Sequence, residues 1–392
     1  MRVLCATALA SLPVLLPATS FAEPLLKPFA DLRYRYEQVT QDNRPETAEA
    51  YTLRLKAGVE TLPVNGFSFL IEGEVIRALG PVRFNDTING KAAYPVVADP
   101  DDALINRLQL SYTQKTNRVV LGRQIIAFDN QRHLGAVGWR QNDQTFDGLS
   151  VKMALGAKTT LEAAYVFQVN RVFGTRSAQG TWDDSEIYLA RVSHSFSPAI
   201  KLSGFVQALD IPDAPVQSGM TTGIVFEGVH SLGSVKGALR AEYAYQKDYG
   251  ANPDRFGLDY FSVEPSLIFG SVTVKATDSV MEGDGISAFQ FPLGTNHAFS
   301  GWADMFLTTP VNGLKEQAVS VAYGHKSGVR VQGALHRFQA ERGGQNYGSE
   351  FNLLIEKLFA KRFVAGLKYA DYRADGFGTD TQKIMPYVQV KY

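Results

Sequence analysis

Short segments in which apolar and polar residues alternate follow one another along nearly the whole 392-residue chain. Each runs for about 10–12 residues with a period of two, the spacing at which a β-strand sends successive side chains to opposite faces. In the segment 235–245, Leu239 and Tyr243 share one face. Arg240 and Glu242 share the other. Similar segments lie at 51–60, 161–168 and 363–369. The pattern predicts an all-β protein.

The spacers between these segments alternate in length. The short ones lie at 62–66, 115–118, 155–158, 196–199, 232–234, 269–271, 326–328 and 358–361. The long ones lie at 40–46, 78–102, 127–145, 171–184, 211–218, 248–256, 282–313, 341–348 and 374–381. A soluble β-sandwich or β-helix also alternates, but it gives no reason for this spacing. Short periplasmic turns and longer extracellular loops are typical of a transmembrane antiparallel β-barrel.

The spacers also set the number of strands. Eight short turns and nine long loops give 18 strands, an even number, as expected when both termini lie on the periplasmic side. The segment 299–307 reads as one further strand, which would make the count odd. We therefore assign 282–313 to a single long loop, with 16 strands as the alternative. The chain ends on a strand whose apolar face carries Val388, Val390 and Tyr392.

The N-terminus has the features of a secretory signal peptide. Arg2 supplies the positive charge, residues 3–16 are mostly apolar, and Ser20 and Ala22 are the small residues that a signal peptidase reads. We predict cleavage after Ala22, so that 1–22 is a signal peptide and 23–392 a single barrel domain in the outer membrane of a Gram-negative bacterium. The only cysteine, Cys5, lies in this leader.

The face of the strands that would line the barrel interior is rich in charge. Strand one would send Asp31, Arg33, Arg35 and Glu37 inward. Further inward charges are expected at Arg54, Lys56, Glu72, Glu74, Arg107, Lys152, Glu162, Lys236, Arg240, Glu242, Lys275, Arg330 and Lys368. Basic groups outnumber acidic ones, which favours anionic solutes. The alternative is that these charges pair across strands and only keep the pore wet.

Several motifs resemble the alginate-export family of outer-membrane porins. They are Leu-Gly-Arg-Gln at 121–124, Trp-Arg-Gln-Asn at 139–142, Thr-Phe-Asp-Gly at 145–148 and the segment 301–310. The strand pattern extends the resemblance over nearly the whole mature chain. The resemblance implies an 18-strand monomeric barrel whose lumen arginines guide a polyuronate.

Carried over to this chain, the resemblance implies pore or constriction arginines at Arg123, Arg132 and Arg140, because the planar guanidinium binds carboxylates through two hydrogen bonds. By position alone, the basic track would continue through Arg33, Arg35, Arg54, Lys56, Arg107, Lys236 and Arg240. The loop or constriction residues would be Trp139, Asp147, Trp302 and Asp304. For Arg140 and Asp147 the alternative is a structural pair. For the apolar segment 301–307 it is a loop anchor or a plug lying against the wall.

We therefore predict an outer-membrane porin for hydrophilic, anionic solutes such as a polyuronate, an oligosaccharide or an organic acid. The alternatives are a general diffusion porin and a plugged structural barrel. No Gly-x-Ser-x-Gly elbow or Gly-rich phosphate loop is present, so we predict no enzyme, cofactor or metal site. The 39 basic and 39 acidic residues do not indicate nucleic-acid binding. The expected partners are outer-membrane lipid and the barrel-assembly machinery, with a periplasmic partner left open.

Overall fold

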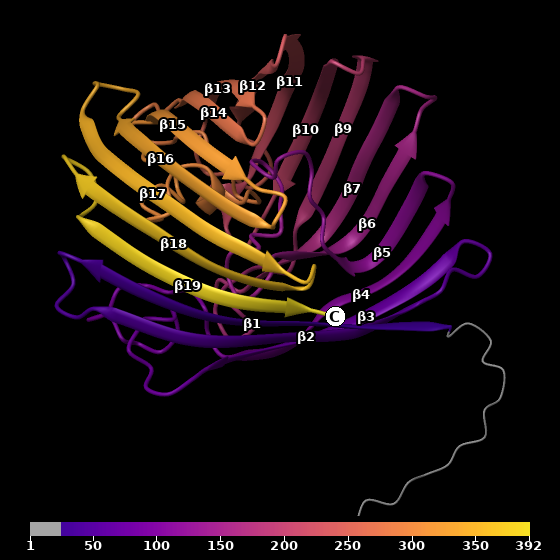
Figure 1. Cartoon of the computed structure of the whole chain (residues 1–392), viewed down its shortest axis with the longest axis horizontal. Helices are drawn as coiled ribbons and strands as arrows, with labels where there is room; N and C mark the ends of the chain where they lie inside the picture. The colour runs from indigo at the N-terminus through magenta and orange to yellow at the C-terminus, as the bar shows by residue number, and fades with distance from the viewer. Residues whose placement is uncertain (1–24) are drawn as a thin grey trace, which may run out of the picture.

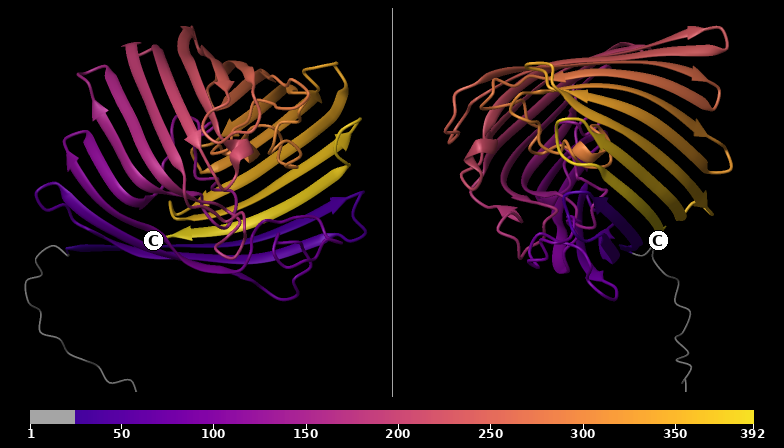
Figure 2. Two further views of the ribbon diagram at one scale, coloured as in Figure 1. Left: turned by 180° about the vertical axis from the view of Figure 1, so that it is seen from behind. Right: turned by 90° about the vertical axis from the view of Figure 1, so that its left-hand side faces the viewer.

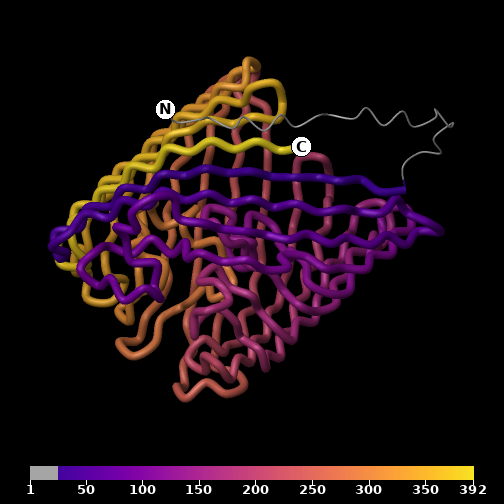
Figure 3. The backbone as a smooth tube through the Cα atoms, turned by 90° about the horizontal axis from the view of Figure 1, so that it is seen from below, coloured from indigo at the N-terminus to yellow at the C-terminus, as the bar shows by residue number. Residues whose placement is uncertain are grey.

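The strands form a ring that closes on itself (Figures 1 and 3). A computed structural model describes residues 25–392, and the predicted signal peptide lies outside them. The ring strands are β1 Leu26–Gln41, β2 Ala48–Thr61, β3 Phe67–Ala78, β4 Asp102–Gln114, β5 Asn117–Gln124, β6 Thr145–Ala154, β7 Thr159–Asn170, β9 Glu186–Ser197, β10 Ile200–Asp210, β11 Gly219–Leu232, β12 Val235–Lys247, β13 Gly257–Phe269, β14 Val272–Met281, β15 Leu314–Gly324, β16 Val329–Gln339, β17 Asn346–Phe359, β18 Phe363–Ala374 and β19 Thr381–Lys391.

Every ring strand pairs antiparallel with its neighbours, and β1 pairs with β19 to close the ring. Leu32 lies opposite Val390 at this junction, and Tyr34 lies opposite Val388. The predicted 18-strand barrel is thus confirmed. Closure leaves no free sheet edge, which is the condition for a sheet to cross hydrocarbon.

Among residues 25–392, one additional strand lies outside the ring. This strand, β8 Thr181–Trp182, pairs only with the end of β7 and sits in the loop between β7 and β9. The alternation of apolar and polar residues did not predict this strand, because two residues are too few to show an alternating pattern. No strand forms at 299–307, so 282–313 is one loop as we predicted, with a single 3-10 turn, η2 Asn296–Ala298. A second 3-10 turn, η1 Pro215–Gln217, follows β10.

The outer face of the ring is apolar and carries aromatic residues near both ends of the strands. Tyr165 and Tyr188 pack with ring centroids 5.2 Å apart toward the long-loop end. Phe67 and Tyr112 pack at 4.8 Å toward the short-turn end. Leu121, midway between such residues, is 55% exposed although it is apolar. Two aromatic girdles around an apolar band are typical of a barrel in a lipid bilayer. No helix of the described residues is long and apolar enough to span a membrane.

A hydrophobic core lies inside the barrel, between the β14–β15 loop and the wall. The ring of Phe306 packs 4.4 Å from that of Phe338 and 5.8 Å from that of Tyr372. At Gly301 the backbone has φ +84°, and a Cβ would lie 2.3 Å from the Glu350 carboxylate. Only glycine therefore lets the backbone approach β17 this closely. The segment 301–307 is thus a loop anchor lying against the wall.

Candidate functional site

Three of the long loops turn toward the lumen, and the β14–β15 loop can be followed inside the ring in Figure 2. They are the β3–β4 loop (79–101), the β5–β6 loop (125–144) and the β14–β15 loop (282–313). The second and third meet directly, because Gly135 N donates to Leu293 O at 2.9 Å. The side-chain amide of Gln144 also donates to Leu293 O at 2.9 Å. The open end of an 18-strand ring is thereby reduced to a narrow, charged passage.

One side of the passage is a row of cations on neighbouring strands, which we name the basic wall. Its members point inward from β18, β19, β1 and β2, and all are buried. They are Arg33, Arg35, Arg54, Lys56, Lys368 and Lys383. The first five were predicted to face the lumen from strand alternation. Lys383 was missed, although it alternates with Met385 and Tyr387 on the inner face of the last strand.

Each of the three inward loops contributes one aspartate to the basic wall. Asp99 of the first loop pairs with Arg35. Asp143 of the second pairs with Lys56. Asp304 of the third lies 2.6 Å from Lys383. We name these three the loop aspartates. Because the side chain of each is buried against a cation, ionic contacts hold every loop in place.

The electrostatics of these loop residues follow from the pairing. Burial by itself would raise the pKa of Asp143, but the Lys56 ammonium beside it holds the pKa below its ordinary value. Burial opposes ionisation of Asp304 in the same way, and His297 and Lys383 hold its pKa well below the ordinary value. Both aspartates therefore stay charged at neutral pH.

Arg140 lies between the β14–β15 loop and the wall. It donates to the Asp304 carboxylate at 2.8 Å and to that of Glu37 at 3.3 Å. Burial would lower its pKa, but these two carboxylates raise it above the ordinary value. The alternative in which Arg140 pairs with Asp147 is therefore wrong.

Lys368 stands out in the basic wall because two indole rings flank it. Its ammonium lies 4.2 Å from the Trp139 ring and 4.1 Å from the Trp302 ring. It also lies 2.6 Å from Nε2 of His297, whose Nδ1 is 2.6 Å from Asp304. Among residues 25–392, no carboxylate lies within ion-pair distance of Lys368. Two ring contacts and the hydrogen bond to His297, rather than a carboxylate, hold this side chain in place.

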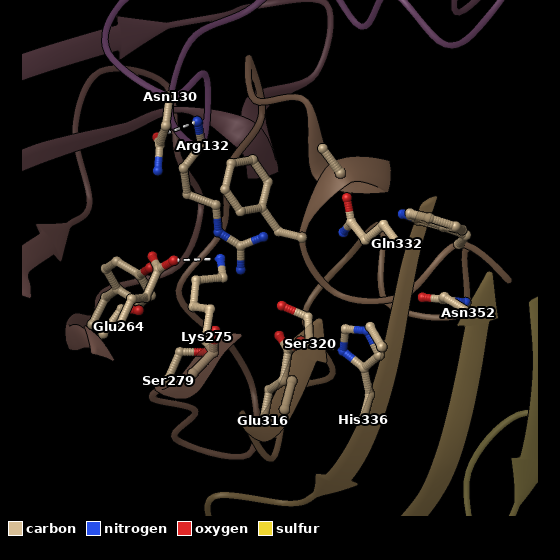
Figure 4. Close-up of a pocket in the computed structure, with 18 residues that line it drawn as sticks. Asn130, Arg132, Glu264, Lys275, Ser279, Glu316, Ser320, Gln332, His336 and Asn352 are labelled. Atoms are coloured by element: carbon tan, nitrogen blue, oxygen red, sulfur yellow. Dashed lines mark hydrogen bonds and ion pairs between the residues drawn. The ribbon is translucent and has the colours of Figure 1, made fainter. Parts of the chain in front are cut away.

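Arg132 is a second cation held by rings. Its guanidinium carbon lies 4.1 Å from the Phe291 ring and 4.8 Å from the Phe299 ring. It enters a narrow cavity from the β5–β6 loop, and Lys275 enters the same cavity from β14 (Figure 4). Lys275 is paired with Glu264 at 2.7 Å. Arg132 has no such partner among the described residues, so it leaves positive charge in the lumen.

The predictions of a pore position for Arg123 and a constriction position for Asp147 are wrong. Arg123 lies directly opposite Leu108 and two residues beyond Leu121, and both leucines are exposed on the outer face. Asp147 is its cross-strand partner on β6, with nitrogen–oxygen distances of 2.8 Å in both hydrogen bonds. The pair lies near the long-loop end of the wall, where a charge on the outer face costs least.

Replacing Arg123 by alanine should leave ion selectivity unchanged and lower the stability of the barrel by about 2 kcal/mol, because a charge-assisted pair is lost. The reversal potential under a salt gradient measures the ion selectivity. The stability is measured by heating samples to a series of temperatures before gel electrophoresis and recording the temperature at which the band of the folded barrel disappears. Asp147→Asn should have a similar effect, and the double variant should cost little more than either single one. A loss of anion selectivity in Arg123→Ala would contradict the outward placement.

The remaining predicted residues lie on the inner face. Arg107 is paired with Glu72 at 2.7 Å. Arg240 is paired with Asp129 at 2.5 Å and with Glu242 at 2.8 Å. Lys236 lies on the same face as Arg240, near the short-turn end of β12. No group of three metal-ligating side chains occurs among residues 25–392.

The fold and the lumen define the class: an 18-strand antiparallel barrel narrowed by inward loops. The same architecture occurs in solved structures of outer-membrane proteins. Acinetobacter baumannii OccAB4 matches with a TM-score of 0.68 and 14% identity, over 94% of this chain and 98% of that one. Pseudomonas aeruginosa OpdL matches with a TM-score of 0.72 and 14% identity, over 94% of this chain and 98% of that one. The outer membrane protein opdK from P. aeruginosa matches with a TM-score of 0.67 and 13% identity, over 93% of this chain and 99% of that one.

At this level of identity the likeness establishes the fold. No protein-family model matches the sequence, and no curated protein matches it significantly. The structural relatives are Occ and Opd proteins, so the barrel implied by the resemblance to alginate exporters is present, whereas alginate export itself gains no support.

Proposed function

We propose that this protein is an outer-membrane channel that passes small, hydrophilic, anionic solutes. The observation that carries the proposal is the basic wall, which faces a lumen that three loops have narrowed. These cations are buried, and Lys383 alone among them lines the large cavity at the long-loop end, so they act on a solute mainly through their electrostatic field. Fixed charge at a constriction is how pores of this kind select among ions.

The membrane location is part of the proposal. The apolar outer face with two aromatic girdles supports it, as does the shared fold with outer-membrane proteins. The signal peptide predicted at residues 1–22 would carry the chain across the inner membrane. The barrel-assembly machinery would then be the expected folding partner, since closed barrels need insertion as a unit.

Cations without carboxylate partners support the anionic preference. A paired cation offers a solute little net field, because its counter-charge lies within a few ångströms. Lys368 and Arg132 are held by aromatic rings instead of acids, so no contacting carboxylate cancels a positive charge at either position. No feature of the geometry favours a polymer such as alginate, so the proposed solutes are small anions.

A general diffusion channel is the second candidate. The pairing of most wall cations favours it, for example Arg54 with Asp31 at 3.0 Å and Lys56 with Asp143. In that case the charges cancel, and the lumen passes cations and anions alike.

The deciding measurement is the reversal potential of the purified barrel in a planar bilayer under a salt gradient. We expect anion selectivity in the wild type, and a decrease in the anion-to-cation permeability ratio of about threefold to tenfold in Lys368→Met with Arg132→Gln. Lys236→Gln is the matched control, because it removes a lumen cation outside the constriction. An unselective wild type, or an unchanged ratio in the double variant, favours the general channel.

A further inference from the structure

Arg171 is an arginine of the outer vestibule that the sequence patterns did not single out. It begins the β7–β9 loop and lines a cavity of about 710 Å³ at the long-loop end of the lumen. Arg140, His297 and Lys383 line the same cavity. We name this cavity the outer vestibule. A solute arriving from outside enters it before passing the members of the basic wall other than Lys383.

The guanidinium of Arg171 contacts two aromatic rings. Its carbon is 4.2 Å from the Trp182 ring and 4.8 Å from the Phe173 ring. Nη1 donates to the backbone oxygen of Gln179 at 3.2 Å, and the buried Nε has no hydrogen-bond partner. Among the described residues, no carboxylate lies within ion-pair distance of it. The group therefore keeps an uncancelled charge and N–H donors that the protein does not use.

The loop that carries Arg171 is held in place from several sides. Trp182 belongs to β8 and pairs with Val169 of β7, which explains why a two-residue strand exists outside the ring. The hydroxyl of Thr175 donates to the Asp102 carboxylate at 2.8 Å. The side-chain amide of Asn142, on the inward β5–β6 loop, donates to Val172 O at 3.1 Å. A guanidinium on such a support is pre-positioned, which lowers the cost of binding.

We propose that Arg171 is a solute-binding residue of the outer vestibule, where it binds the carboxylate of a small mono- or dicarboxylate before the solute passes to the basic wall. The inference rests on the proposed function, because it assigns the first contact on the same path. The two rings beside the guanidinium exclude part of its water, which strengthens its attraction for an anion. Its planar donors suit the two oxygens of a carboxylate.

The test is single-channel recording of the full-length mature barrel with succinate added to one side at a time. We expect succinate from the long-loop side to interrupt the current briefly in the wild type. In Arg171→Gln the rate of these interruptions should fall about tenfold, because a fixed cation in a cleft raises the association rate of an anion. Succinate from the short-turn side should interrupt the current at the same rate in both proteins.

Two controls separate this site from general effects. Arg176→Gln removes an exposed arginine of the same loop, which donates to Asp101 O at 2.7 Å, and should behave as the wild type. The uncharged diamide succinamide should interrupt the current equally rarely in every protein. An equal succinate rate in Arg171→Gln and Arg176→Gln, or no side-dependent interruption in the wild type, would overturn the inference. Anion selectivity in the wild-type reversal potential would show that the proposed function survives that result.

Discussion

Replacing Asp304 by asparagine should release the β14–β15 loop and give a larger, noisier single-channel conductance. Asp304 is the only loop carboxylate in contact with Arg140, Lys383 and His297 together among the described residues. Removing its charge leaves the buried cations Arg140 and Lys383 with Glu37 as their only carboxylate among the described residues, at 3.3 and 3.8 Å. Breaking such a pair costs about 3 kcal/mol or more, which would shift the docking equilibrium of the loop about a hundredfold.

The control for this experiment is Asp42→Asn, which neutralises an exposed carboxylate between β1 and β2 and should conduct as the wild type. The double variant Asp304→Asn with Lys383→Gln should regain part of the lost docking, because one unpaired cation is removed as well. If Asp304→Asn conducts as the wild type, the anchor around Phe306 alone holds the loop, and the ionic contacts are secondary.

Acidification should release the same loop, beginning below about pH 6.5. In the docked loop, Nδ1 of His297 faces the Asp304 carboxylate and Nε2 faces the Lys368 ammonium. Nε2 must accept from that ammonium, so the docked imidazole is neutral. Burial, reinforced by the neighbouring Lys368 charge, lowers the pKa of His297 to about 3, against an ordinary 6.5.

The sign of the pH effect follows from these values. Between pH 6.5 and about 3 the His297 imidazole of the released loop binds one more proton than that of the docked loop. The stabilisation of docking by neutral His297 is therefore fully present above pH 6.5 and weakens as the pH falls. Each pH unit within this window weakens docking about tenfold. Protonation of Asp304 contributes to release of the loop only when the pH falls toward 3.8, the ordinary pKa of an aspartate.

Single-channel conductance recorded from pH 7.5 down to pH 4.5 measures this effect. We expect opening fluctuations to grow as the pH falls in the wild type. They should stay constant over this range in His297→Gln, which cannot gain the proton. A response of the same size in both proteins would show that another group senses the pH.

Strand alternation predicted the ring because it is a local property. Each strand reports its own two faces, and turn lengths report which end of the barrel they occupy. The placement of Arg33, Arg35 and Lys368 followed from the same local rule. Arg123 was misplaced because a motif resemblance overrode its alternation with Leu121, which on its own assigns the outer face.

The loop contacts could not be predicted in this way. Asp304 reaches Lys383 across 79 residues, and Lys56 reaches Asp143 across 87. The two-residue alternation of a strand shows which face a side chain lies on, but it does not show which distant loop residue the side chain contacts. Asp304 was selected from a motif, but its partners Lys383 and His297 became apparent only when the loop was seen inside the ring. Arg171 had no local signal other than the aromatic residues near it in sequence.

The basic wall is built from both ends of the chain, and this has a consequence for assembly. Arg33 and Arg35 belong to the first strand, whereas Lys383 belongs to the last, and they come together only when β19 pairs with β1. All three loop aspartates lie between these ends in sequence. The loop aspartates that pair with cations near the β1–β19 junction are thus synthesised before β19. The last strand can therefore pair with a wall that already carries these carboxylates. A chain that stops short of β19 would lack both Lys383 and the β1–β19 pairing, so closure of the ring and completion of the basic wall are one event.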